Sequence, residues 1–151
     1  MKRILHYVEL PPVWLALFAA LAWLQARLFP MDVTGRAGDL IGTGLVAAGL
    51  AVSGWAALHF VLERTSLIPR ERPDKLVTTG LFRVSRNPIY LADTAILLGL
   101  ILIWDALPSL ILVPLFMKVI EARFIRREEA LIRAHYGPAF DAYCERVRRW
   151  L

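Results

Sequence analysis

One uninterrupted apolar segment constrains the fold of this chain more than any other feature. Residues 40–62 contain no Asp, Glu, Lys or Arg over 23 positions. Because a helix needs about 20 apolar residues to cross the hydrocarbon core of a bilayer, this segment predicts a transmembrane helix. A second run, residues 10–29, is interrupted only by Gln25 and Arg27 near its end. The basic N-terminus could instead begin a signal peptide, but no small-residue cleavage site follows the apolar run, which favours a second span.

The composition supports a membrane protein and excludes several other classes. Hydrophobic residues make up 58% of the 151 positions, whereas a soluble domain has roughly 45–50%. This excess argues against a soluble enzyme and against a disordered chain. The single cysteine, Cys144, cannot form an internal disulfide, so a secreted disulfide scaffold is also excluded.

Two shorter apolar runs form a helical hairpin. Residues 89–103 and 106–120 flank Trp104-Asp105 and contain 15 residues each, about 22 Å at a rise of 1.5 Å per residue. They are either two spans or a deep re-entrant pair. We therefore expect one all-α domain, an integral membrane helical bundle of about four transmembrane helices, over residues 1–151. Its spans are approximately 10–29, 40–62, 89–104 and 106–122, with a cytoplasmic loop at 63–88 and a cytoplasmic tail at 123–151.

Small residues recur at helical spacing within the longest apolar segment. Gly44 is followed by Ala48, and Gly49 by Ser53. Such pairs predict close packing against a neighbouring helix in lipid.

The distribution of basic residues predicts how the chain is oriented in the membrane. All but two of the 18 Lys and Arg residues, the exceptions being Arg27 and Arg36, lie before residue 10, in residues 63–88 or beyond residue 117. The positive-inside rule places these three regions, and hence both termini, on the cytoplasmic side. The excess also suits contact with anionic headgroups, so we expect membrane lipids as partners and no nucleic acid.

The 63–88 segment is rich in turn-forming residues and ends in a helix start. Asn87 is available as an N-cap and Pro88 as the first helical residue. The free N–H groups of this helix would then face the cytoplasmic surface, where they could meet a ligand. Alternatively, Asn87 only caps the helix.

The C-terminal segment predicts two helices. The first continues from the fourth apolar run to Tyr136, where Gly137 and Pro138 end it. The second is a short amphipathic helix after Pro138. Its apolar face carries Phe140, Tyr143, Cys144 and Val147.

Two adjacent glutamates in the first of these helices have different neighbours. Glu129 lies one turn from Arg126 and Arg133, which predicts a solvated ion-pair face. Glu128 has only apolar residues three and four positions away. Since burial of an unpaired carboxylate is costly, Glu128 needs a partner. That partner is either a protein arginine or a cationic ligand group such as an ammonium.

Asp93 is a further ionisable residue at an unexpected place, one turn into the third apolar helix. Ionisable groups within membrane helices are rare and usually functional. Motifs for phosphate loops, zinc sites and nucleophile elbows are absent. The three histidines are scattered, so no metal is expected.

Several motifs in a fixed order resemble one family. They are residues 65–69 (TSLIP), 76–83 (LVTTGLFR) and 86–91 (RNPIYL), followed by Glu128-Glu129, Tyr136-Gly137 and the ending around Tyr143 and Val147-Arg148-Arg149. These segments are similar to those of the isoprenylcysteine carboxyl methyltransferase-like proteins, integral membrane enzymes akin to the phospholipid N-methyltransferases. The resemblance covers over half of the chain.

The resemblance implies transfer of a methyl group from S-adenosylmethionine at the cytoplasmic face of the membrane, here of a bacterial inner membrane. The implied cofactor-binding residues are Leu76, Val77, Asn87, Pro88, Tyr90 and Glu128, with Phe82 packing the adenosine beside Tyr90. An arginine before the glutamate pair is associated with the acceptor in this family. Arg123 and Arg126 are the candidates, and spacing favours Arg126.

Three positions depart from the family pattern. Asn87 replaces the histidine of the eukaryotic members, Phe82 replaces a tyrosine, and Ala92, followed by Asp93, replaces a glycine. These differences leave cofactor binding in place and put the acceptor in doubt.

The resemblance favours carboxyl O-methylation of a prenyl-like or other lipophilic carboxylate, with Arg126 at the acceptor. N-methylation of a phospholipid or lipophilic amine is the alternative and would use Asp93. A small four-helix exporter that couples to cations through Asp93, or a structural membrane subunit, would be a different class of protein.

Overall fold

The computed structural model describes residues 10–62 and 76–151. Within these ranges the chain is helical and contains no strand, which confirms the all-α prediction. The helices are α2 (Pro11–Leu28), α3 (Gly35–Leu62), α4 (Pro88–Ile103), α5 (Leu112–Ile120), α6 (Arg126–Tyr136) and α7 (Pro138–Arg146). Two 3-10 turns lie at Gly80–Arg83 and Leu107–Ile111, and a π-helical turn, Glu121–Ile125, joins α5 to α6.

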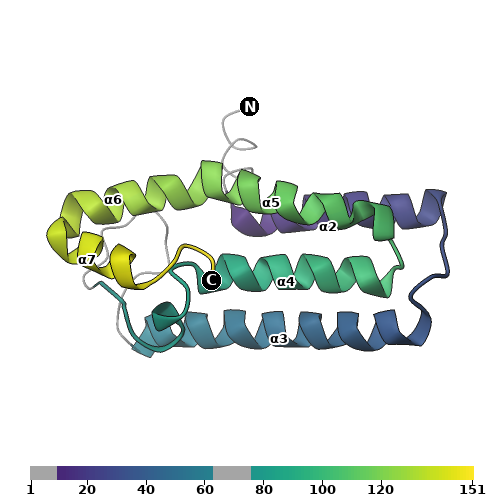
Figure 1. Cartoon of the computed structure of the whole chain (residues 1–151), viewed down its shortest axis with the longest axis horizontal. Coiled ribbons are helices and arrows are strands. Elements are labelled where there is room, and N and C mark those ends of the chain that lie inside the picture. The colour runs from purple at the N-terminus through teal and green to yellow at the C-terminus, as the bar shows by residue number, and fades with distance from the viewer. Residues whose placement is uncertain (1–9, 63–75) are drawn as a thin grey trace.

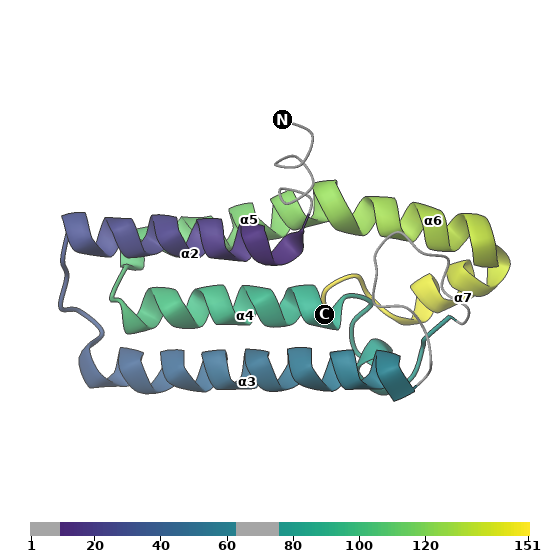
Figure 2. The same ribbon diagram turned by 180° about the vertical axis from the view of Figure 1, so that it is seen from behind.

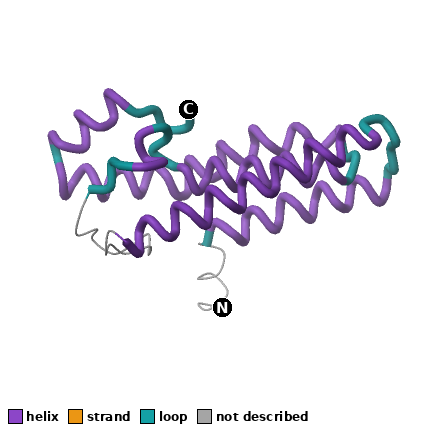
Figure 3. The backbone as a smooth tube through the Cα atoms, turned by 90° about the horizontal axis from the view of Figure 1, so that it is seen from below, coloured by secondary structure: helices purple, strands orange, loops and turns teal. Residues whose placement is uncertain are grey.

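The long helices run side by side. Figure 1 shows α4 between α3 on one side and α2 with α5 on the other, and Figure 2 shows the same order from behind. At one end α6 and α7 extend beyond the bundle beside the segment that leads into α4, whereas the other end holds only short turns (Figure 3). The expected continuation of the fourth apolar segment into a helix that ends at Tyr136 is confirmed.

Glycines bring α3 and α4 into close contact. A Cβ atom on Gly42 would lie 2.6 Å from the carbonyl oxygen of Gly99, and one on Gly49 would lie 2.8 Å from that of Ala92. The predicted packing role of Gly49 is therefore confirmed. The same prediction is wrong for Gly44, which has nothing within 4 Å because it lies on another face of the helix.

The core lies among α2, α4 and α5. Its buried side chains include Phe18 and Ala22 of α2, Leu97 and Ile101 of α4, and Phe116 and Ile120 of α5. The rings of Phe18 and Phe116 meet edge to face, with centroids 5.4 Å apart. This packing holds α5 against α2 and α4.

Within residues 10–62 and 76–151, two helices are long and apolar enough to cross a membrane, α2 and the first 24 residues of α3. Only 11% and 17% of their most apolar stretches are buried in the structure. A core helix of a soluble protein would be mostly buried, so these exposed apolar side chains suit contact with lipid. Helix α4 has 16 residues and α5 has 9, so four complete crossings remain a prediction.

The far end of the bundle is held together by hydrogen bonds. The carboxylate of Asp105 accepts hydrogen bonds from the backbone N–H groups of Val33 and Thr34 at the start of α3. The hydroxyl of Ser109 donates to the side-chain oxygen of Gln25 at 2.9 Å. These bonds fix the turns of this end, and the cavity described below lies at the other end.

Candidate functional site

The C-terminal tail is fastened to the segment that leads into α4. The backbone N–H of Arg86 donates to the carbonyl of Arg148 at 3.0 Å. The hydroxyl of Tyr143 donates to the carbonyl of Phe82 at 2.6 Å. Burial raises the pKa of Tyr143 to about 12, so this hydroxyl remains a donor at neutral pH. The tail and α7 therefore form one wall of the site together with residues 76–87.

Asn87 joins this arrangement in a different way from the one predicted. Its side chain makes no capping bond at the start of α4. Instead, its amide nitrogen donates to the carbonyl of Arg149 at 2.9 Å, and its backbone N–H donates to the hydroxyl of Ser85 at 3.1 Å. The prediction that the Asn87 side chain caps α4 is therefore wrong. The side chain is hydrogen-bonded to a carbonyl of the distant C-terminal tail instead. Pro88 is the first residue of α4, as predicted.

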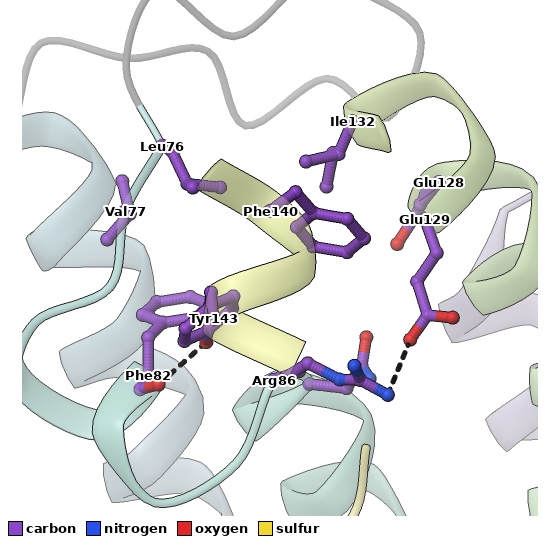
Figure 4. A pocket seen from close by; sticks show the side chains of 10 residues that line it. Leu76, Val77, Phe82, Arg86, Glu128, Glu129, Ile132, Phe140 and Tyr143 are labelled. Carbon is purple, nitrogen blue, oxygen red and sulfur yellow. Dashed lines mark hydrogen bonds and ion pairs between the residues drawn. The ribbon is translucent and has the colours of Figure 1, made fainter. Parts of the chain in front are cut away.

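A cavity of about 140 Å³ lies between this wall and α6 (Figure 4). Its lining residues are Leu76, Val77, Phe82, Arg86, Asn87, Glu128, Glu129, Ile132, Phe140 and Tyr143. Five of the seven predicted cofactor residues are among them: Leu76, Val77, Phe82, Asn87 and Glu128. The structure thus brings residues from three separate stretches of the sequence around one cavity, which is mostly apolar on one side and charged on the other.

Among the described residues, Glu128 is a cavity-lining carboxylate that has no cationic partner. It is half-buried, and it accepts a hydrogen bond of 2.7 Å from the hydroxyl of Tyr90. In the part of the chain that the structure describes, no ion pair involves Glu128. Burial raises the pKa of this carboxyl above its usual range, although the hydrogen bond from Tyr90 opposes the shift. No arginine among the described residues therefore pairs with Glu128, and the alternative of an arginine partner finds no support in this part of the chain.

Glu129 is buried, with 8% exposure, whereas the sequence predicted a solvated ion-pair face. Its two oxygens accept hydrogen bonds from Arg149, at 3.1 Å from Nε and 2.7 Å from Nη2. One oxygen also lies 3.2 Å from Nη2 of Arg86. The prediction is wrong because these partners come from distant segments of the chain rather than from the same helix.

The arginines expected beside Glu129 have other partners. Arg126 pairs with Glu121 at 3.0 Å, and Arg133 pairs with Asp141 at 2.8 Å. The side chain of Arg126 is 68% exposed and does not line the cavity. A role for it at the acceptor remains a prediction.

The remaining predicted residues lie close to the cavity without lining it. Tyr90 reaches it through its bond to Glu128, and Pro88 is buried at the start of α4. Asp93 is buried at 9% exposure, one helical turn beyond Tyr90 on α4. Among the described residues, no group of three His, Cys, Asp or Glu side chains could hold a metal ion.

The π-helical turn Glu121–Ile125 interrupts the long helix directly before α6. Such a turn inserts an extra residue, so it redirects the side chains that follow, and π-turns are frequent at functional sites. Glu128 and Glu129, which face the cavity, come immediately after it.

Sequence reasoning did not place five of the lining residues at the site: Arg86, Glu129, Ile132, Phe140 and Tyr143. A signal existed for three of them. Arg86 directly precedes Asn87 within a quoted motif, and Phe140 and Tyr143 lie on the apolar face predicted after Pro138. That face packs on Leu76 and Ile132, as the amphipathic pattern led us to expect of a docked helix.

The chain belongs to the phospholipid methyltransferase family, whose sequence model matches residues 38–139. The matched range includes most of the cavity wall, from Leu76 to Ile132. Searches of curated proteins and of solved structures found no match. Family membership confirms the resemblance inferred from the motifs, and together with the exposed apolar faces of α2 and α3 it supports membrane association.

Proposed function

We propose that this protein transfers a methyl group from S-adenosylmethionine to a lipophilic acceptor at the cytoplasmic face of a membrane. The observation that carries the proposal is Glu128, a half-buried carboxylate that lines the cavity and has only the Tyr90 hydroxyl as its hydrogen-bond partner among the described residues. The amino-acid end of the cofactor carries an ammonium, and a charge-assisted hydrogen bond to Glu128 would hold it.

The other lining residues suit the same ligand. Leu76, Val77 and Phe82 offer an apolar surface for the nucleoside, and Tyr90 fixes the orientation of Glu128. When bound, S-adenosylmethionine supplies a methyl group activated by its sulfonium. Little acid–base chemistry is then needed, so the chain contributes mainly by positioning the reactants and excluding water.

The acceptor is proposed to be the amine of a lipid. The carboxyl O-methylation expected from the resemblance needs a cation at the acceptor, but Arg126 is exposed and paired with Glu121. Asp93 is buried on the same helix as Tyr90, and among the described residues it has no ion-pair or hydrogen-bond partner. Its carboxylate would hold an ammonium headgroup and accept its proton, which frees the nitrogen lone pair for methylation. The exposed apolar sides of α2 and α3 suit a substrate whose tail remains in the bilayer.

Methyl-labelled S-adenosylmethionine tests this proposal. The purified protein is incubated with membrane lipid extract, and the lipids are treated with base. We expect label that survives the treatment, because methylamines keep it whereas methyl esters release it. Asp93→Asn should reduce incorporation by about 100-fold, the scale of a lost acid–base group, without weakening cofactor binding.

Other results would favour the alternatives. Base-labile label that depends on Arg126 would favour carboxyl O-methylation. If the protein neither bound the cofactor nor transferred label, the proposed function would be wrong. Loss of cation resistance in Asp93→Asn, without any cofactor binding, would favour the exporter.

A further inference from the structure

The long helix formed by α5, the π-helical turn and α6 separates its charges by sign. Between residues 112 and 136, all five Lys and Arg residues are exposed, whereas the three acidic residues are buried or half-buried. The acidic residues are Glu121, Glu128 and Glu129, and the basic residues are Lys118, Arg123, Arg126, Arg127 and Arg133. The inward side of this helix is therefore acidic and its outer surface is basic.

Three of the five basic residues have no anionic partner among the described residues. Arg126 and Arg133 each form an ion pair with a carboxylate. The ion pairs within the described ranges do not include Lys118, Arg123 or Arg127. Because all three are exposed and follow one another along one helix, they form a positive surface that can bind one anionic group through several cations.

Trp14 joins this positive surface to the first turn of α2. The guanidinium of Arg123 lies over the indole ring of Trp14, 4.8 Å from its centroid. The two helices lie side by side, as Figure 2 shows and as the contact between the rings of Phe18 and Phe116 requires. Tryptophan is enriched where membrane helices meet the lipid headgroups. The pair therefore places an unpaired cation beside a residue typical of the headgroup level.

The outer surface of the bundle changes from apolar to basic at this level. On α5 the exposed Leu115 is followed three positions later by the exposed Lys118. On α2 the apolar side chains of Val13 and Leu17 are exposed on either side of Trp14 along the chain. Apolar surfaces of this kind suit acyl chains, and long basic side chains at their border reach the headgroups. The positive-inside rule makes this border the cytoplasmic one, where the leaflet carries anionic lipids.

We propose that Trp14, Lys118, Arg123 and Arg127 form a binding surface for the headgroup of an anionic phospholipid of the inner leaflet. The unpaired cations would bind the phosphate oxygens, and the acyl chains would lie along the exposed apolar sides of α2 and α5. A headgroup without an ammonium fits best, because no carboxylate between residues 112 and 136 is exposed to receive one. This inference goes beyond the proposed function and requires only a membrane, since the bound lipid is a resident partner and not the methyl acceptor.

Native mass spectrometry of the full chain in detergent tests the proposal with two lipids that have identical acyl chains. Phosphatidylglycerol is anionic, whereas phosphatidylcholine carries an ammonium on the same phosphate. Offered both in equal amounts, the wild type should retain phosphatidylglycerol about 10- to 100-fold more, because each basic residue near a membrane surface contributes roughly fivefold. Lys118→Gln, Arg123→Gln and Arg127→Gln should each lower this preference about fivefold, and the triple variant should abolish it.

Matched variants separate a local site from a general effect of charge. Arg36→Gln makes the same change at an exposed arginine at the start of α3, at the other end of the bundle, and should keep the wild-type preference. Trp14→Leu removes the cation–π contact and should lower the preference about two- to fivefold. Trp14→Phe keeps an aromatic ring and should retain part of it. Excess inorganic phosphate should not displace the lipid, because the acyl chains also bind.

Four results would overturn the proposal. They are a wild type without a preference for phosphatidylglycerol, a preference that survives the triple substitution, an equal loss in Arg36→Gln, and displacement of the lipid by inorganic phosphate. An equal loss in Arg36→Gln would show that net charge alone attracts the lipid, and displacement would assign the basic surface to a soluble anion.

Discussion

Replacing Glu128 by glutamine should stabilise the ligand-free protein and at the same time weaken cofactor binding. The stability effect follows from the pKa, which burial raises in the folded state. A carboxyl with a raised pKa binds its proton more tightly in the folded than in the unfolded protein. Its ionisation therefore costs stability as the pH rises through the usual glutamate pKa toward the raised value.

The structure shows why glutamine removes this cost cleanly. Its side-chain oxygen can still accept the hydrogen bond that Tyr90 donates to Glu128. Each unit by which burial raises the pKa corresponds to about 1.4 kcal/mol at neutral pH. For a chain of this length, each kcal/mol corresponds to roughly 2–4 °C in Tm. The gain should vanish at low pH, where the carboxyl is protonated in both the folded and the unfolded state.

Whereas Glu128→Gln should stabilise the ligand-free protein, it should lower the affinity for the cofactor. Without the carboxylate, the charge-assisted bond to the ammonium of the cofactor is lost, which costs about 1.5–3 kcal/mol, or roughly 10- to 100-fold in Kd. The affinity of the wild type should fall as the pH drops through the raised pKa of Glu128, because the protonated carboxyl no longer attracts a cation. The affinity of Glu128→Gln should not vary over this range.

Thermal unfolding across a pH series and calorimetric titration, both in the same detergent, measure the two effects. Glu145→Gln makes the same chemical change at an exposed position of α7 and should alter neither quantity. If Glu128→Gln bound S-adenosylmethionine as tightly as the wild type, Glu128 would not be the ammonium partner. If the ligand-free variant were less stable than the wild type at neutral pH, the account of a costly buried charge would be wrong.

Three further variants test the framework of the site. Gly42→Ala places a Cβ 2.6 Å from a backbone oxygen of α4, so it should lower the free energy of unfolding, measured by thermal unfolding, by about 1–3 kcal/mol. In Gly44→Ala the new Cβ meets nothing within 4 Å, so the free energy of unfolding should rise by up to about 1 kcal/mol because alanine has the higher helix propensity. Tyr143→Phe removes a buried donor to the segment before α4, so it should cost about 1–3 kcal/mol and weaken cofactor binding. Tyr90→Phe removes the bond that lowers the pKa of Glu128, so the pH below which cofactor affinity falls should move upward in a titration series. Unchanged values for Gly42→Ala, Tyr143→Phe or Tyr90→Phe would contradict the corresponding contact.

Local features of the fold were predictable because they depend on neighbours along the chain. Hydrophobic runs predict helices, and the start of α4 at Pro88 and the end of α6 at Gly137 follow from residues that begin and end helices. The sequence also singled out Glu128 as a carboxylate among apolar neighbours, because these neighbours lie three and four positions away on the same helix, and Glu128 is half-buried in the structure. The motifs added the expectation that Leu76 and Val77 face the same site.

Features that depend on distant segments were not predictable in this way. Glu129 is buried against Arg149, 20 residues further along the chain, and also meets Arg86. Asn87 binds the tail instead of capping its helix. No periodic pattern connects these positions, because their separation along the chain follows from how α7 and the tail fold back over the start of α4.

The amino-acid sequence by itself determined that this chain forms apolar helices and that one carboxylate, Glu128, requires a partner. Only the tertiary structure decided which cation remains available beside it. Over the described residues, the pairing of Glu129 with Arg149 leaves Arg86 with one ion-pair contact, at 3.2 Å to Glu129, and with an Nε that has no hydrogen-bond partner. Local patterns specify secondary structure and amphipathic faces, whereas the balance of charges in a cavity depends on every segment that packs around it.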